Sequence, residues 1–368
     1  MTIVVAYAPR PEGQAALDKG IEIIGTRSDE IPAVSIMIAL PGGIRAEGKG
    51  ELGLASLTAA MLGQGTARLS EAELSDELQK LGASISVSTA QYNNLITISS
   101  LTDKLPQTLA LVREVLLQPG LREADFERLK AQTLQGMKQS EQQPEWLAGQ
   151  AFRELVYGKQ NRLGQPTDGV LTDVEKLTLA DVKRFYHAYY NPTNAKVVVT
   201  GDVTQQQVEQ QLGFLTEWQG AAPTLGDLKL KGEQAKAGIY LVDKPGAPQS
   251  VIRIGRRAMP FDTTGEYFVA NLMNFNLGGN FNSRINLNLR EDKGYTYGAS
   301  SGFQANREAG IFATGANVRT DATADAIRQF LKEMDGYRAS GPTPVELAYM
   351  RSAVSQQDAL SYETLGQK

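Results

Sequence analysis

The sequence has no cysteine and only one histidine, His187, among its 368 residues. The lack of cysteine excludes disulfides, thiolate metal ligands and a cysteine nucleophile, and it fits a periplasmic or a cytoplasmic location. The single histidine excludes a zinc site built from two or three histidines of this chain, and it leaves a Ser-His-Asp triad only if His187 serves it alone. Because His187 stands among Tyr186, Tyr189 and Tyr190, we interpret it as a structural residue.

Long apolar runs and an excess of basic residues are missing as well. No run approaches the ~20 residues that a membrane-spanning helix requires. The net charge is −4, so the composition indicates no nucleic-acid partner. The opening residues, MTIVVAYAPRPEGQ, have neither the basic start nor the apolar stretch of a signal peptide. A hydrophobic share of 42% and a charged share of 21% are typical of a globular protein with a sizeable core.

The order of predicted elements occurs twice, which predicts an α+β fold of two similar α/β-sandwich units in tandem. We place the first unit at residues 18–215, a linker at 216–237 and the second unit at 238–368, and we expect the second unit to be truncated at its C-terminus. The predicted elements of the second unit are the strands Ile239–Asp243, Ser250–Arg256, Tyr295–Phe303 and Gly310–Ala316 and the helices Glu266–Leu277, Ile285–Leu289, Asp321–Tyr337 and Thr343–Ala359.

The first unit has two well-marked helices. Residues 50–63 are apolar on most sides of a helix, which is typical of a buried one. Ser70, with Glu73 three residues later, is the pattern of a capping box that opens the next helix. Thr178 and Thr343 have an acidic residue at the same spacing and also predict helix starts.

The stretch NFNLGGNFNSRINLNLREDKGYTYG, residues 274–298, places an arginine and a tyrosine close together between turn signals. We expect Arg290 at a helix end and Tyr297 at a strand start, on either side of Gly294, with both side chains facing one cleft. Two such donors aimed at one oxygen would stabilise a developing negative charge by about 3–4 kcal/mol each. The alternative is a solvated helix end at Arg290 and a half-buried strand at Tyr297.

The helix GLASLTAAMLGQGT, residues 53–66, resembles the metal-binding helix of the pitrilysin/insulinase-type zinc peptidases, the inverzincins, whose motif is H-x-x-E-H. The two histidine positions and the glutamate position fall on Ser56, Ala60 and Ala59, which neither bind zinc nor transfer a proton. The helix that supplies a carboxylate ligand in the family corresponds to about Glu127–Gln143. It has glutamines and a glycine where the acid is expected (Gln132, Gln135, Gly136). The zinc motif is therefore degenerate, and the resemblance implies no metal in this chain.

The stretch GGNFNSRINLNLREDKGYTYG resembles the second signature of the same family, written R/Y. The resemblance assigns to Arg290 and Tyr297 the binding of the substrate backbone and of the tetrahedral oxyanion, and to Gly278 and Gly279 the place of a Gly-rich loop linked to substrate handling. Further matches are the segments Tyr189–Val203 and Leu111–Lys130, and the resemblance covers about residues 20–365.

The resemblance implies the non-catalytic half of a two-part zinc metallopeptidase that degrades peptides, with the two halves face to face as a clamshell. Zinc is then expected in a homologous partner half, either a separate subunit or the N-terminal part of a longer polypeptide, and this chain alone is expected to be inactive. The way the chain starts and ends favours the longer polypeptide. A bacterial precursor of that kind favours the periplasm, and the cytoplasm is the alternative. Family relatives often dimerise, so a homodimer is also compatible with the resemblance.

Two other functions stay open. One is a structural or assembly scaffold of the same fold, as among respiratory-complex core proteins, although Arg290 and Tyr297 in register count against it. The other is a metal-free enzyme whose Gly278–Gly279 loop holds phosphate, although the loop lacks the following Lys-Ser/Thr of a phosphate-binding loop.

Overall fold

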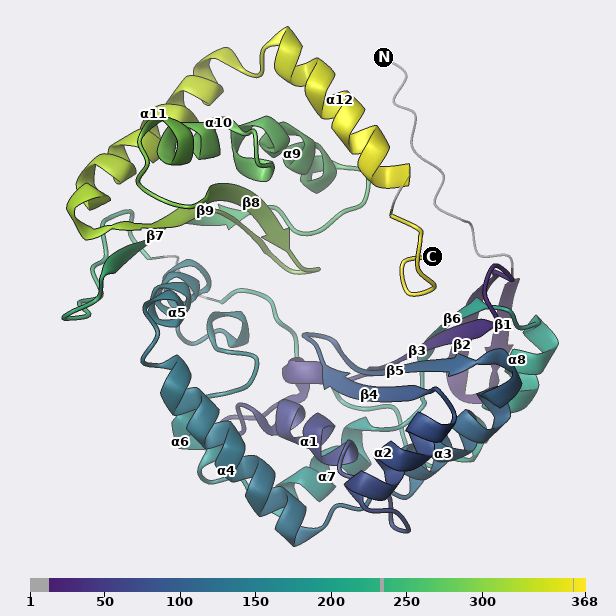
Figure 1. The fold of residues 1–368 in the computed structure, drawn as a ribbon. Helices are drawn as coiled ribbons and strands as arrows, with labels where there is room; N and C mark the ends of the chain where they lie inside the picture. Colours follow the sequence, from purple (N-terminus) through teal and green to yellow (C-terminus); the bar gives the residue numbers. More distant parts are fainter. Residues whose placement is uncertain (1–12, 232–234, 360) are drawn as a thin grey trace. The chain divides into compact units, whose positions relative to one another are not determined.

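The computed structural model describes residues 13–231, 235–359 and 361–368 (Figure 1). The chain divides into two compact units, which we describe one at a time. Unit 1 comprises residues up to 137, 167–227 and 358–368, and unit 2 comprises residues 138–166 and 228–357. Across the described ranges, every helix is too short or too polar to cross a membrane.

Unit 1 joins a mixed sheet to a layer of helices. Its strands are β1 (Gly13–Leu17), β2 (Ile21–Arg27), β3 (Ala33–Pro41), β4 (Ser84–Thr89), β5 (Asn93–Leu101) and β6 (Lys196–Gly201). Its helices are α1 (Leu54–Leu62), α2 (Glu71–Lys80), α3 (Leu105–Leu117), α4 (Glu123–Ser140, whose end passes into unit 2), α6 (Leu171–Val174), α7 (Leu179–Tyr189) and α8 (Gln205–Gln211). The strand order is β1-β2-β6-β3-β5-β4, and α1, α2, α3 and α7 gather on one face of this sheet (Figure 1).

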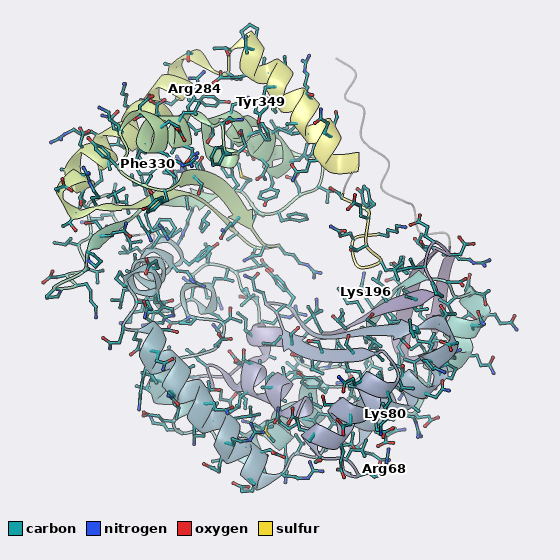
Figure 2. All side chains as sticks on the ribbon, viewed as in Figure 1. Arg68, Lys80, Lys196, Arg284, Phe330 and Tyr349 are labelled. Atoms are coloured by element: carbon teal, nitrogen blue, oxygen red, sulfur yellow. The ribbon has the colours of Figure 1, made fainter. Side chains whose placement is uncertain are left out.

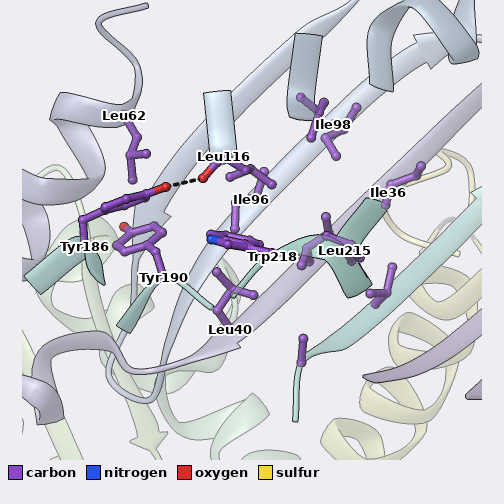
Figure 3. Close-up of a cluster of buried hydrophobic side chains, with 14 of the residues drawn as sticks. Ile36, Leu40, Leu62, Ile96, Ile98, Leu116, Tyr186, Tyr190, Leu215 and Trp218 are labelled. Carbon is purple, nitrogen blue, oxygen red and sulfur yellow. Dashed lines mark hydrogen bonds between the residues drawn. The ribbon is translucent and has the colours of Figure 1, made fainter. Parts of the chain in front are cut away.

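Strand β6 holds the middle of the sheet in unit 1. It pairs parallel with β2, with Ile23 opposite Val197, and antiparallel with β3, with Ile36 opposite Val199. The apolar side chains of all three strands alternate toward the helices, so Ile23, Ile36 and Val197 belong to one core. Figure 3 shows part of this cluster, in which Tyr186 of α7 donates a hydrogen bond of 2.6 Å to the carbonyl of Leu116.

The predicted buried helix and the predicted caps are confirmed in unit 1. All but two residues of α1 are buried, and the helix begins at Leu54 because Gly53 has a left-handed backbone, with φ at +103°. A Cβ at Gly53 would lie 2.5 Å from the carbonyl oxygen of Asp168, so only glycine fits there. Capping boxes open α2 at Ser70 and α7 at Thr178.

Unit 2 has a smaller sheet. Its strands are β7 (Gln249–Ala258), β8 (Ala299–Ala305) and β9 (Gly310–Arg319). Its helices are α5 (Pro144–Tyr157), α9 (Glu266–Asn274) with its π-helical end η6 (Phe275–Gly279), α10 (Arg284–Asn286) with its π-helical continuation η7 (Leu287–Asp292), α11 (Thr323–Ser340) and α12 (Pro344–Ala359). The strands are antiparallel in the order β7-β9-β8, and α9, α10 and α11 pack on one face around Ile252, Leu289 and Phe330. Figure 2 labels Phe330, which belongs to α11.

Helix α5 belongs with unit 2, whereas the sequence-based boundary at residue 215 assigns residues 138–166 to the first unit. The guanidinium of Arg257 on β7 donates to the carbonyls of Val156 and Tyr157, at 2.6 and 3.2 Å. Glu145 at the other end of α5 accepts a hydrogen bond of 2.7 Å from Asn317 on β9. These contacts link residues far apart in sequence, which a local pattern does not reveal.

One predicted strand, at residues 239–243, is wrong, and another, predicted at residues 295–303, begins four residues later, as β8. Residues 239–243 form neither helix nor strand, and Ile239 and Leu241 are almost fully exposed. Residues 295–298 are a turn that precedes β8. The turn forms because Gly294 has φ at +63° and because the Tyr295 amide returns to the carbonyl of Leu289 at 2.9 Å, which ends the helix instead of starting a strand.

Candidate functional site

The degenerate zinc helix is α1, and its three motif positions have different surroundings. Ser56 donates hydrogen bonds to the Asp168 carboxylate at 3.3 Å and to the Thr167 carbonyl at 3.4 Å, so its hydroxyl is used by a neighbouring loop. Ala59 is buried and Ala60 is exposed. One hydroxyl and two methyl groups do not make a zinc site. The glutamines at the third-ligand position, Gln132 and Gln135, are exposed on α4 together with Gly136. Within the part of the chain that the structure describes, no cluster of three histidine, cysteine or acidic side chains is placed to hold a metal.

Gly278 and Gly279 lie at the end of a helix, in η6, and not in an open loop. Gly278 is buried against β8, and a Cβ there would come within 2.5 Å of the Ser301 backbone nitrogen and still nearer its hydroxyl oxygen. Next to it, Asn274 donates to the Ser301 carbonyl at 2.7 Å and accepts from the Ser301 hydroxyl at 2.5 Å. Close packing of helix on strand therefore explains Gly278, while Gly279 is exposed. This packing disfavours a phosphate-binding loop.

Arg290 lies on η7 and is held by an aromatic ring. Its guanidinium carbon is 4.4 Å from the centre of the Phe281 ring, a cation–π contact, and its side chain is 31% exposed. Its Nη1 is 3.0 Å from the Glu291 carboxylate, yet that buried nitrogen has no properly directed hydrogen bond to any residue in the described ranges. The ion pair is thus a contact of charge only, and a hydrogen-bond donor on Arg290 stays unused.

Tyr297 lies in the turn that connects η7 to β8. Its side chain is 94% exposed. The turn is anchored on both sides, since the hydroxyl of Tyr295 donates to Asp325 at 2.9 Å and the amide of Ala299 donates to the Asn286 side chain at 3.0 Å. Arg290 and Tyr297 are therefore seven residues apart on one anchored segment, but their surroundings differ, since Arg290 lies against Phe281 and Tyr297 is exposed.

A stronger charged pair in the same region has no signal in the local sequence. Arg284 on α10, labelled in Figure 2, donates two hydrogen bonds of 2.6 and 2.7 Å to the carboxylate of Glu346 on α12. Both side chains are largely buried. Arg284 also stacks on the Tyr337 ring at 4.8 Å. The hydrogen bonds from Arg284 lower the pKa of Glu346 to about 2. This pair fastens α12 to the helical layer, and a separation of 62 residues hides it from local reasoning.

His187 borders a hollow of about 370 Å³ in unit 1, lined by aromatic side chains, an arginine–glutamate pair and a few others (Arg113, Leu117, Tyr186, His187, Tyr190, Glu217, Trp218 and Gln219). Arg113 and Glu217 form an exposed ion pair at 2.6 Å. Burial raises the pKa of Tyr186 to about 12 and raises the pKa of Tyr190 as well, so both phenols stay protonated at neutral pH. The imidazole of His187 lies edge-on to Tyr186 at 5.2 Å, which agrees with the structural interpretation of this histidine.

Comparison with known proteins matches both parts of the chain to one family. Residues 23–167 match the model described as insulinase (peptidase family M16), and residues 176–354 match the peptidase M16 inactive domain. An uncharacterized zinc protease of Streptomyces coelicolor is 25% identical over 313 residues, which cover 83% of this chain and 67% of that protein. A protein of Helicobacter pylori named as the non-peptidase homolog YmxG is 23% identical over 356 residues, which cover 95% of this chain and 80% of that one. A solved peptidase M16 inactive domain from Pseudomonas fluorescens superposes with a TM-score of 0.87 at 24% identity, covering 94% of this chain and 84% of its own.

Proposed function

Because the chain belongs to the insulinase-type peptidase family M16, we propose that it is the substrate-binding, non-metal-binding half of a two-part peptidase that degrades peptides. Its own residues do not fit the zinc ion of the family, as Ser56, Ala59 and Ala60 offer no suitable ligands. The hydrolytic chemistry then depends on a homologous zinc-bearing half. This chain contributes binding and orientation of the peptide.

One observation carries the proposal, namely the unused donor of Arg290. A buried guanidinium N–H without a directed acceptor costs free energy, about 1–3 kcal/mol, unless some group satisfies it. The guanidinium carbon lies 4.4 Å from the centre of the Phe281 ring, and this contact favours one orientation of the fork before a ligand arrives. A peptide carbonyl, or the oxyanion that forms from it, is an acceptor of the right kind. In this proposal Arg290 holds the carbonyl and strengthens its hold as negative charge develops.

Tyr297 supplies a second donor in the proposal. Its hydroxyl is accessible, and the anchors at Tyr295 and Asn286 hold the turn that carries it. A single directed hydrogen bond from the phenol to the same substrate segment would fix the register of the peptide. Gly279, exposed at the end of η6, is a further candidate for contact with the substrate backbone, whereas Gly278 serves packing.

The test is peptide hydrolysis by this chain alone and by a mixture with a zinc-bearing homologous half. We expect activity only in the mixture. We expect Arg290→Ala and Tyr297→Phe each to lower kcat/KM by tenfold or more, which corresponds to about 1.4 kcal/mol of barrier. Arg290→Lys should have a kcat/KM close to that of Arg290→Ala, because an ammonium group lacks the planar fork of a guanidinium.

Matched controls come from the same unit. Arg338 on α11 has a side chain that is 84% exposed and pairs with Asp335, so Arg338→Ala should leave the activity of the mixture unchanged. Tyr349→Phe on α12 removes a hydroxyl that accepts a surface hydrogen bond of 3.2 Å from Asn282, and it should also leave the activity unchanged. Hydrolysis by this chain alone in the presence of a chelator would refute the division of labour between two halves.

The second candidate is a scaffold of the same fold with no part in peptide hydrolysis. The nearly complete exposure of Tyr297 favours it, because a preassembled oxyanion site would hold its donors in place. If this chain stimulates peptide hydrolysis by the zinc-bearing half, and neither Arg290→Ala nor Tyr297→Phe reduces that stimulation, the scaffold function is favoured.

A further inference from the structure

Unit 1 has a hollow of about 370 Å³ among α3, α7 and the end of the short helix η5 (Leu212–Glu217). Ligand pockets in proteins have volumes of about 300–1,000 Å³, so the hollow has room for a small molecule. Every residue that lines it belongs to unit 1. The hollow is therefore built from other residues than Arg290 and Tyr297, for which peptide binding is proposed.

The most deeply buried part of the lining holds a hydroxyl without a partner. Tyr186 and Tyr190 are 6% and 1% exposed, and their rings stack with centres 5.8 Å apart (Figure 3). The Tyr186 hydroxyl donates to the Leu116 carbonyl at 2.6 Å, whereas the Tyr190 hydroxyl has no hydrogen-bond partner among the residues that the structure describes. A buried hydroxyl in this state costs free energy, so an acceptor that a ligand brings to Tyr190 gains a hydrogen bond at no loss to the protein.

Trp218 adds an aromatic wall whose backbone is held on both sides. Its side chain is 5% exposed, and its carbonyl accepts a hydrogen bond of 2.6 Å from the ammonium group of Lys19. Two residues later the backbone lies against Asn191, because a Cβ at Gly220 would be 2.4 Å from the Asn191 Cβ. The wall is thus formed before any ligand arrives, which lowers the ordering cost of binding.

The rim of the hollow carries one positive and one negative charge side by side. Arg113 on α3 and Glu217 at the end of η5 form an ion pair at 2.6 Å, and their side chains are 50% and 57% exposed. An ion pair that is this exposed contributes little to stability, so its members can exchange each other for the charges of a ligand at small cost. The guanidinium fork of Arg113 matches a carboxylate, and Glu217 matches an ammonium group. A molecule that carries both groups on neighbouring atoms is an α-amino acid.

We propose that the hollow binds a free aromatic α-amino acid with a polar group on its ring, of which tyrosine is the simplest example. In this arrangement the ligand carboxylate accepts from Arg113, its ammonium group donates to Glu217, and its ring packs among the aromatic side chains of the lining. The ring hydroxyl of the ligand accepts from Tyr190. Because the Tyr190 oxygen is closed to water in the structure, binding includes a small movement of the lining side chains.

The charges and the buried hydroxyl favour this ligand over simpler ones. A hydrocarbon would leave the Tyr190 hydroxyl unpaired and would use neither charge of the rim. An anion such as phosphate would meet Glu217 next to Arg113, and a simple cation would meet Arg113 next to Glu217. Only a zwitterion satisfies both charges of the rim at once.

The test measures the fluorescence of Trp218 during titration with four small molecules. The chain has two tryptophans, and the Trp146→Phe variant leaves Trp218 as the only reporter. The ligands are tyrosine, phenylalanine, tyramine and desaminotyrosine, and the last three lack the ring hydroxyl, the carboxylate and the ammonium group respectively. We expect a saturable change with tyrosine and about tenfold weaker binding of each of the other three.

Variants of the lining assign each contact to one residue. Tyr190→Phe should bind tyrosine and phenylalanine equally well, and it should not lower the free energy of unfolding, because no hydrogen bond is lost. Arg113→Ala and Glu217→Ala should each weaken tyrosine binding about tenfold, while Arg113→Ala should leave tyramine binding unchanged. Lys80→Ala, which removes an exposed ion pair of 2.8 Å with Glu77 elsewhere in unit 1, is the matched control and should not change binding.

Three outcomes would overturn the proposal. One is the absence of a saturable change with tyrosine, which would leave the hollow to water alone. Another is equal affinity of the parent chain for tyrosine and phenylalanine, and the third is tyrosine binding that persists unchanged in Arg113→Ala and Glu217→Ala. Arg290→Ala should bind tyrosine as the parent chain does, so the result is independent of the proposed peptidase function.

Discussion

Ile23 of unit 1 and Leu241 of unit 2 hold the same place in a repeated order of strands and helices, yet one is buried and the other faces water. The local sequences are alike, IEII and IYLV. The difference lies in the neighbour, because β6 joins β2 to its sheet and no described strand does so for residues 239–243. Strand formation here depends on an available edge and not on propensity.

The two units also differ in which family signature residues they keep. Unit 1 has lost the chemistry of its metal helix, and its motif positions Ser56 and Ala59 now serve a loop contact and a core. Unit 2 keeps the Arg290 and Tyr297 signature, although its sheet is smaller and its α9 is partly exposed. Both units thus keep a similar order of elements, while only unit 2 keeps the residues for which we propose a function.

The largest expected effect tests the burial contrast directly. Ile23→Ala should lower the free energy of unfolding of unit 1 by about 2–5 kcal/mol, because the side chain leaves a cavity in a packed core. Leu241→Ala should change the free energy of unfolding of unit 2 by no more than about 0.5 kcal/mol, since the side chain is already exposed to water. Urea denaturation followed by circular dichroism measures both. Equal losses would mean that Leu241 is buried in solution and that the contrast is false.

A smaller effect is expected at the helix end in unit 2. Gly278→Ala should cost about 1–3 kcal/mol, because the added Cβ overlaps Ser301 of β8 and forces helix and strand apart. Gly336→Ala is the matched change inside α11, where nothing lies within 4 Å of the new methyl group, and it should stabilise the helix by about 0.5–1 kcal/mol. Thermal unfolding of the two variants compares them. A neutral Gly278→Ala would remove the packing explanation and return this glycine to a role in substrate handling.

The ion pair between Arg284 and Glu346 predicts a pH dependence that is confined to unit 2. The pKa of Glu346 in the fold is about 2, below the ordinary value of 4.5, so its stabilisation is fully present above about pH 4.5 and is lost as the pH falls toward 2. Allowing for partial exposure, we expect the pair to contribute about 1–3 kcal/mol. Glu346→Gln should cost about this much at pH 7 and almost nothing at pH 2.

The readout is hydrogen exchange in α12 between pH 2 and 7, corrected for intrinsic exchange rates. Asp335→Asn, in an exposed pair with Arg338, is the control and should change stability by less than about 0.5 kcal/mol throughout. If α12 in Glu346→Gln keeps the same pH dependence as the parent chain, another carboxyl group is responsible.

Sequence reasoning predicts the elements whose causes are local. The capping box at Ser70, the cap at Thr343 and the buried helix α1 follow from spacing within a few residues, and the structure has each of them. The Arg284–Glu346 pair and the contacts of α5 with β7 depend on residues brought together by the fold, so no local pattern indicates them. The strand predicted at residues 295–303 begins only at Ala299, because the turn at Gly294 keeps residues 295–298 out of the sheet.

The smallest expected effects on stability come from two tyrosines of that turn, Tyr295 and Tyr297. Replacing each with phenylalanine compares a hydroxyl that stabilises the turn with one that is proposed to bind substrate. Tyr295→Phe removes a hydrogen bond of 2.9 Å to Asp325 and should lower the unfolding midpoint of unit 2, because the hydroxyl ties the turn to α11. Tyr297→Phe should change the free energy of unfolding by less than about 0.5 kcal/mol, because Tyr297 is 94% exposed. Activity in the presence of a zinc-bearing half should respond in the opposite order, falling most for Tyr297→Phe. A Tyr297→Phe variant that loses stability as well would place the phenol in the fold, and its lost activity would then say nothing about substrate.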